Sequence, residues 1–168
     1  MRCAEMVRGA SLRGPKDALG FDAALRLGRA LGTLARRRAR NAPILLGRTS
    51  GVAETRVRDG LAAGLVLAGV TVVDIGVVES DRFTGALRAG PKPWWPLAGG
   101  VYVSIAGDSV GVMVFDGMRP VVGAPLADVA RIADDAFALA EGGIVVALDA
   151  RVLPRAPVQD TLANDGAP

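Results

Sequence analysis

Apolar residues recur at every third or fourth position in several stretches of the chain, which is the pattern of a helix with one buried face. In residues 21–38 this spacing places one set of side chains on the inner face: Phe21, Leu25, Gly28, Leu31 and Leu34. The same spacing predicts further helices over 54–68, 81–89 and 125–141.

Short apolar runs predict buried strands over 43–47, 71–78 and 144–148, and the second of these is rich in β-branched residues. Residues 101–117 read VYVSIAGDSVGVMVFDG, in which a polar loop, 106–109, joins two apolar runs. We expect these runs to form an antiparallel pair. The alternation of helices and strands then predicts an α/β fold, a three-layer α/β/α sandwich with a mixed, mostly parallel sheet.

The length of 168 residues suits a single domain, and the 51% apolar content is enough for one hydrophobic core. We expect that domain to cover residues 1–142. Residues 143–168 are expected to hold the final strand and a flexible C-terminal tail, because the end of the chain is polar.

The chain contains no histidine and one cysteine, Cys3, so a histidine base, a His/Cys metal site and an internal disulfide are excluded. We expect a cytoplasmic protein, because no stretch reaches the roughly 18 apolar residues of a membrane helix and no signal peptide is recognisable. The net charge is +3. The basic run 36–40 lies at a predicted helix end and has no interleaved aromatic residues, which argues against a nucleic-acid partner.

Two segments resemble the first domain of the α-D-phosphohexomutases, the phosphomannomutase and phosphoglucomutase family. Residues 47–78, GRTSGVAETRVRDGLAAGLVLAGVTVVDIGVV, are similar to the family's GRDTR segment, the helix behind it and its AGVxVxDxGVxPTP strand. The start, VRGASLRG, is similar to the FGTSGIRG segment, in which Arg13 and Gly14 match. The resemblance implies the α/β/α fold of that first domain.

The loop of residues 101–117 resembles the family's catalytic segment VxxTASHNPxxxNGIKLF but lacks its reactive groups. In this alignment Ala106 falls on the phosphoserine, Gly107 on the histidine and Met113 on the lysine. Alanine has no oxygen to phosphorylate, and a thioether transfers no proton at neutral pH. The resemblance therefore implies a degenerate catalytic loop with no catalytic residue.

Some polar groups remain for residual contacts with an anion in the former cleft. They are Arg13, Ser104, Gly107, Ser109 and Arg48. Asp108 argues against an anion at the loop itself, because its charge repels a phosphate at short range. The family uses Mg²⁺, but its DGDxDR ligand loop is missing from this sequence, so no cofactor and no metal site are expected here.

The adjacent residues Trp94 and Trp95 lie between prolines and form an insertion relative to the family pattern. Two neighbouring indoles between prolines are difficult to bury together, so they are a candidate interaction patch; a lid packed on the domain's own edge is the alternative.

Two functional hypotheses follow. The first is a truncated, divergent phosphomannomutase/phosphoglucomutase-like domain related to carbohydrate metabolism, without mutase activity on its own; a complete paralogous mutase is a candidate partner, and weak sugar-phosphate binding stays open. The alternative is one part of a split phosphohexomutase, an intramolecular phosphotransferase, that needs a complementary chain with the metal-binding and sugar-binding domains.

Overall fold

The computed structural model describes residues 2–38, 42–90, 96–135 and 145–147. One 3₁₀ helix and four α-helices are present in these ranges: η1 (Cys3–Met6), α1 (Phe21–Arg38), α2 (Val52–Leu67), α3 (Ser80–Ala89) and α4 (Ala124–Asp134). The strands are β1 (Val7–Arg8), β2 (Ser11–Pro15), β3 (Ile44–Arg48), β4 (Val72–Val77), β5 (Gly99–Ala106), β6 (Ser109–Asp116), β7 (Arg119–Pro120) and β8 (Val145–Ala147). The predicted last turns of the fourth helix and the polar tail lie outside the described residues.

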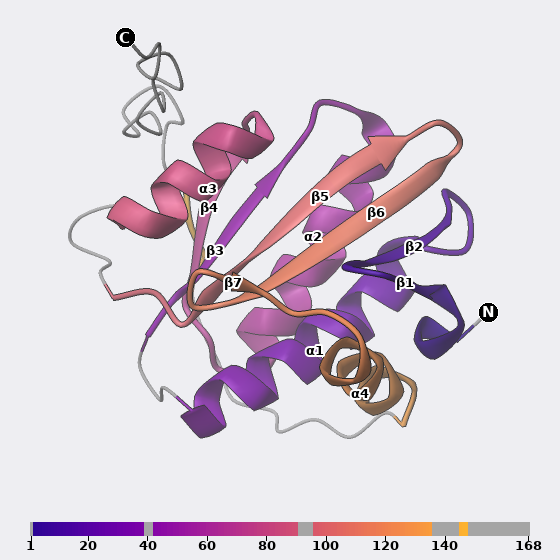
Figure 1. The fold of residues 1–168 in the computed structure, drawn as a ribbon, viewed down its shortest axis with the longest axis horizontal. Helices are drawn as coiled ribbons and strands as arrows, with labels where there is room; N and C mark the ends of the chain where they lie inside the picture. The colour runs from indigo at the N-terminus through magenta and orange to yellow at the C-terminus, as the bar shows by residue number, and fades with distance from the viewer. Residues whose placement is uncertain (1, 39–41, 91–95, 136–144, 148–168) are drawn as a thin grey trace, which may run out of the picture.

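All strands form one mixed sheet, in the order β1-β2-β6-β5-β3-β4-β8, with β7 paired to β6 (Figure 1). Strands β5, β3, β4 and β8 run parallel to one another, whereas β6 runs antiparallel to both β5 and β2. Most strands therefore run in one direction, as the sequence predicts. Strand β8 joins the sheet edge, and the boundary between 1–142 and the rest stays a prediction.

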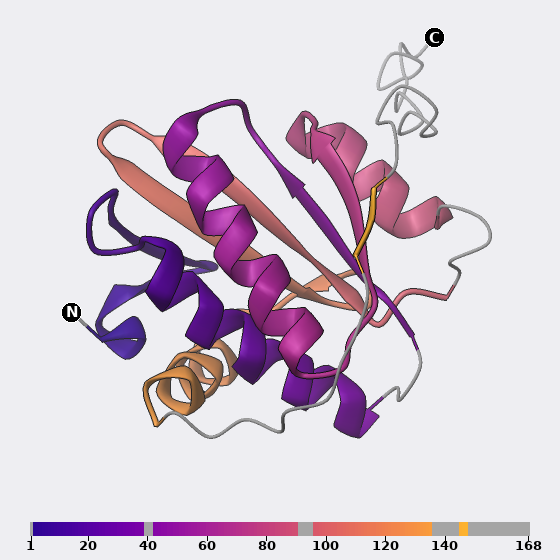
Figure 2. The same cartoon turned by 180° about the vertical axis from the view of Figure 1, so that it is seen from behind.

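Helices cover both faces of the sheet, which confirms the predicted three-layer arrangement. Helices α1, α2 and α4 lie on one face and α3 lies on the other (Figures 1 and 2). The larger apolar cluster is built under α1, α2 and α4, and it includes Leu27, Leu61 and Leu126. A smaller cluster under α3 is centred on Phe83, whose ring lies 5.0 Å from that of Tyr102 and 5.7 Å from that of Phe115.

Helices α1 and α2 approach each other closely because glycines face each other across their contact. A Cβ on Gly64 would lie 2.1 Å from the carbonyl oxygen of Leu25, and one on Gly28 would lie 2.4 Å from that of Leu61. No real side chain fits at such distances. Glycine is therefore required here by the distance between two backbones.

The bounds of α1 agree with the prediction, but its buried face is rotated from the predicted one. Phe21 is 40% exposed, and Leu25 and Leu34 are half-buried. The buried set contains smaller residues instead: Ala23, Ala24, Leu27, Gly28, Ala30, Leu31, Gly32 and Thr33. The short distance to α2 explains the difference, since small side chains and not the largest apolar ones fit at the contact.

The N-terminal segment is attached to the end of α4. The carboxylate of Asp134 accepts hydrogen bonds from the backbone N–H groups of Cys3 and Ala4, at 2.8 and 3.0 Å. It thereby satisfies two donors at the start of η1 that have no partner within a helix. The start of the chain and the end of α4 thus form one unit.

Candidate functional site

The β5–β6 connection is a two-residue turn, Gly107 and Asp108, between the paired residues Ala106 and Ser109. Gly107 has a φ of +62°, a conformation that a tight hairpin turn requires and that glycine adopts without strain. The Asp108 carboxylate is fully exposed and lies 3.8 Å from the Nζ of Lys16. The loop is therefore a hairpin tip with one solvated ion pair, whose contribution is small.

Arg13, Gly111 and Ser104 form one row across three strands, which we call the Arg13 row. Arg13 of β2 pairs with Gly111 of β6, which pairs with Ser104 of β5. A Cβ on Gly111 would lie 3.8 Å from Nε of Arg13 and 3.7 Å from Oγ of Ser104. Both polar side chains therefore lie over the glycine, on the same face of the sheet, and glycine leaves the space between them open.

The Arg13 row lies on the α3 side of the sheet. Side chains alternate between the faces of a strand, so Ser104 shares its face with Tyr102, which packs under α3. Ser109 falls on this face too, beside Pro15. The structure therefore brings together three of the predicted contacts, Arg13, Ser104 and Ser109.

Met113 occupies the position that the family resemblance gives to a lysine, and here its side chain is part of the core. It pairs with Tyr102 across the hairpin and packs against the cluster of Phe83. A flexible thioether suits an irregular gap beside aromatic rings. Met113 thus contributes packing at this position.

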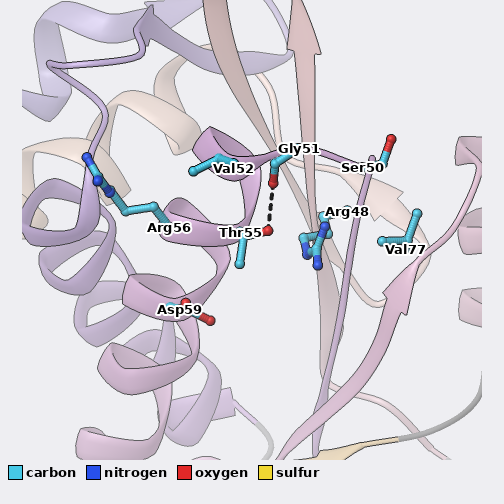
Figure 3. A pocket seen from close by; sticks show the side chains of 8 residues that line it. All are labelled: Arg48, Ser50, Gly51, Val52, Thr55, Arg56, Asp59 and Val77. Atoms are coloured by element: carbon cyan, nitrogen blue, oxygen red, sulfur yellow. Dashed lines mark hydrogen bonds between the residues drawn. The ribbon is translucent and has the colours of Figure 1, made fainter.

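Arg48 lies away from the Arg13 row, at the end of β3 and on the α2 side of the sheet. Its Nη1 donates to the carbonyl oxygen of Thr49 at 3.0 Å. It lines an open pocket of about 620 Å³ with Ser50, Thr55, Asp59 and Val77 (Figure 3). The figure shows that Arg56, also on the rim, points away from Arg48 on the other side of α2.

A second pocket, of about 390 Å³, lies next to the first and shares Ser50, Gly51, Val52 and Arg56 with it. Its other walls include Lys16, Glu54 and Ile105. Strand β3 lies between β5 and β4 in the sheet. The chain passes from β3 to β4 through α2 on one face of the sheet, and then from β4 back to β5 through α3 on the other face. Both pockets lie at the carboxyl end of β3 in this switch point, where α/β folds commonly bind ligands.

Arg58 holds α2 to the sheet. Its Nη1 lies 2.9 Å from Asp59 and 3.4 Å from the buried Asp74 of β4. Asp74 also accepts a hydrogen bond from the backbone N–H of Gly76 at 2.9 Å. These contacts give Arg58 a structural role.

Among the charged residues that line these pockets, sequence reasoning named only Arg48 and missed Lys16, Asp17, Glu54, Arg56 and Asp59. Lys16 directly follows Pro15 and belongs to no motif that we recognised. The only indication that Glu54 belongs to a site was its position within the GRTSGVAE segment. Trp94 and Trp95 lie outside the described residues. Within the ranges the structure describes, no group of three or more His, Cys, Asp or Glu residues is placed to hold a metal, and no helix is long and apolar enough to span a membrane.

No protein-family model matches the sequence, and no curated protein matches it. Solved structures do match the fold. A phosphoglucomutase/phosphomannomutase family protein from Burkholderia thailandensis has a TM-score of 0.78 and 21% identity, over 89% of this chain and 34% of that one. A protein from Thermus thermophilus assigned as a phosphomannomutase has a TM-score of 0.66 and 22% identity, over 90% of this chain and 34% of that one.

This chain thus spans about a third of the length of the proteins it resembles. The identities are low, so the likeness concerns the arrangement of the backbone. It agrees with the resemblance seen in the GRTSGVAE segment and the β5–β6 hairpin. The chain has the α/β/α fold found in about a third of a phosphoglucomutase/phosphomannomutase family protein.

Proposed function

We propose that this chain is a divergent, non-catalytic phosphohexomutase-like domain that binds phosphate esters weakly and performs no mutase reaction on its own. The β5–β6 hairpin carries the proposal. At the position that the resemblance gives to the phosphoserine stands Ala106, which has no side-chain oxygen. A mutase of this family needs a nucleophilic oxygen there, because the phosphoryl group is held covalently between its two transfers.

The neighbouring hydroxyls do not replace the missing nucleophile. Ser104 and Ser109 make no hydrogen bond to a carboxylate in the described part of the chain, and the sequence contains no histidine. Phosphoryl transfer also needs cations around the transferring group and a group that moves a proton. Arg13 places a cation near Ser104, but Met113 supplies neither a cation nor a group that moves a proton.

The Arg13 row supports binding without catalysis. An exposed guanidinium and a hydroxyl on either side of an open glycine offer several hydrogen-bond donors to a phosphate ester, in a geometry that arginine suits. The site is shallow and holds one arginine. We therefore expect a dissociation constant on the order of 1 mM, which corresponds to roughly 4 kcal/mol.

The catalytic part of the proposal is tested with ³²P-labelled glucose 1,6-bisphosphate. We expect no covalent label on the purified chain and none on the Ala106→Ser variant, because restoring the oxygen restores neither the proton-transfer group nor the metal ligands. A complete phosphoglucomutase is the positive control. Labelling of the unmodified chain, or turnover of glucose 1-phosphate by it, would contradict the proposal.

The binding part is tested by titrating glucose 1-phosphate against the ¹⁵N-labelled chain. Amide shifts are expected at Arg13, Ser104 and Gly111, with none when glucose replaces the phosphate ester. Arg13→Ala should weaken binding at least fivefold. Arg119→Ala, which removes an exposed arginine on β7, should leave binding unchanged. Equal binding by both variants would rule out the Arg13 row.

The alternative, a component of a split mutase, is supported by the share of the solved chains that this one matches, 34% in both cases. It predicts that a second polypeptide with a DGDxDR loop is encoded nearby and that mixing the two chains produces mutase activity. Mixing with a complete phosphoglucomutase tests the paralogue as partner. Activity that stays unchanged in both mixtures would leave the non-catalytic domain as the remaining proposal.

A further inference from the structure

Glu54 is a buried carboxylate in the first turn of α2. Its side chain is 1% exposed, and one of its oxygens accepts a hydrogen bond from the hydroxyl of Thr49 at 3.0 Å. No ion pair involves Glu54 among the residues that the structure describes. A buried charge without a cationic partner needs other groups to stabilise it.

The carboxylate of Glu54 lies directly against Gly51, the residue before α2. A Cβ on Gly51 would lie 2.3 Å and 2.7 Å from its two oxygens. Gly51 brings no side chain to cap the helix (Figure 3), and the N-terminus of a helix carries a partial positive charge. Glu54 therefore places its negative charge where an external anion would otherwise be attracted.

An anion that entered the smaller pocket, which Glu54 lines, would come close to the Glu54 carboxylate. Like charges at short range repel each other strongly where one of them is buried away from water. That repulsion offsets the attraction of the helix N-terminus. Two cations, Lys16 and Arg56, line the smaller pocket, but both are exposed, so solvent screens their charges more than that of the buried Glu54. Lys16 also lies 3.8 Å from the Asp108 carboxylate.

We infer that Glu54 determines which ligand charge the smaller switch-point pocket accepts: it excludes phosphate groups from the N-terminus of α2. The smaller pocket then takes neutral or cationic groups. If the domain binds phosphate esters, a premise that rests on the proposed function, the phosphate is directed to the Arg13 row on the opposite face of the sheet. Arg48 lines only the larger pocket, so its charge does not face a ligand in the smaller one.

The test compares inorganic phosphate binding by the full chain and by two variants, Glu54→Gln and Glu54→Ser, in ¹H–¹⁵N spectra. In the unmodified chain we expect no saturable shift at the amides of Gly51, Val52 and Ala53. In at least one variant the same amides should titrate, with affinity at least tenfold higher. The glutamine keeps the shape without the charge, and the serine also vacates the space.

Asp17→Asn is the matched control, because it removes an exposed negative charge from the rim of the smaller pocket without touching Glu54. Its phosphate titration should resemble that of the unmodified chain. The inference is overturned if the unmodified chain binds phosphate at these amides as tightly as the variants, or if neither folded variant gains binding. If the proposed function is wrong, the amides of the Arg13 row show no shift when a phosphate ester is added. Because these are different amides, the two results are distinguishable.

Discussion

Three of the residues that depart from the phosphohexomutase pattern have internal contacts in this fold, whereas Ala106 and Gly107 are exposed at the hairpin tip. Met113, at the lysine position, packs beside Tyr102. Thr49 stands where the GRDTR aspartate would be and bonds Glu54, while Gly51 stands at the second arginine and leaves room for the same carboxylate. The two departures in the GRTSGVAE segment thus form one interacting set with Glu54, in which internal contacts have replaced groups that could face a ligand.

Cys3 predicts how the stability of the protein depends on alkaline pH. Burial, followed by the negative charge of Asp134, raises the pKa of its thiol from 9.0 to about 11. The unfolded chain therefore loses this proton at lower pH than the folded chain. The contribution of this thiol to the free energy of unfolding is complete below pH 9. It is lost as the pH rises to about 11, and the loss is at most about 2 to 3 kcal/mol.

The measurement is urea unfolding of the unmodified chain and of Cys3→Ala at several pH values from 8 to about 11.5. The pKa of Tyr102 is also raised by burial, and its titration is common to both proteins, so it cancels in their difference. The stability difference should fall through this range. A difference that stays constant with pH would contradict the prediction.

At the scale of elements, the contact between α1 and α2 leaves no room for an added side chain at its glycines. Glycines on both helices face backbone atoms of the other: a Cβ on Gly60 would lie 2.4 Å from the carbonyl oxygen of Phe21, and that on Gly64 would be closer still. Backbone atoms cannot rotate away as a side chain can. The pair of helices therefore has to separate if either glycine gains a methyl group.

Gly64→Ala should lower the free energy of unfolding by about 3 kcal/mol, at the upper end of overpacking effects, despite the higher helix propensity of alanine. Gly20→Ala is the control. Its Cβ would meet only the carbonyl oxygen of Asp17 at 3.8 Å, so stability should change by less than about 1 kcal/mol. Chemical denaturation of both variants checks the prediction, and similar losses in the two would refute it.

At the scale of the whole molecule, the residues that the structure describes form two apolar clusters separated by the sheet, and the clusters differ in size. The larger lies under α1, α2 and α4, whereas the smaller joins α3 to the sheet through Phe83, Tyr102 and Phe115. Gly47 and Gly100 leave room for the Phe83 ring, since a Cβ on either would lie within 3 Å of it. The α3 layer thus depends on one aromatic side chain.

Phe83→Ala should destabilise the protein by about 3 to 5 kcal/mol through the lost burial and the cavity left behind. Amides of α3 should exchange with solvent faster than those of α2, because the larger cluster stays intact. Phe21→Ala, at the 40% exposed phenylalanine of α1, is the control and should cost less than about 1 kcal/mol. Equal losses would show that α3 is not held in this way.

Much of the fold follows from local patterns, because α1, α2 and α3 have an apolar period and β3 to β6 are short, largely apolar runs, of which β4 is rich in Val and Ile. Strands β1 and β2 were missed. Segment 7–15 contains glycine, arginine and proline, and it becomes extended through pairing with residues such as Val112, a hundred positions away. The local spacing of apolar residues carries no information about so distant a pairing partner.

The site was predictable only in part. Arg13 and Ser104 are named by the family pattern, but their position on one face is set by the register of β2, β6 and β5. That register also separates them from Arg48, which the sequence places in the same set. Glu54 was missed because its burial results from tertiary packing, and a glutamate in a first helical turn is usually a solvated charge.

The pairing of β2 with β6 has a consequence for the protein while it is being made. Strand β2 leaves the ribosome before its partner residues, 109–112, which follow about a hundred residues later. At roughly 5 to 20 residues per second, the nascent β2 waits on the order of 5 to 20 s with its apolar residues uncovered. A polypeptide whose translation stops before β6 therefore presents chaperones and proteases with an incomplete sheet.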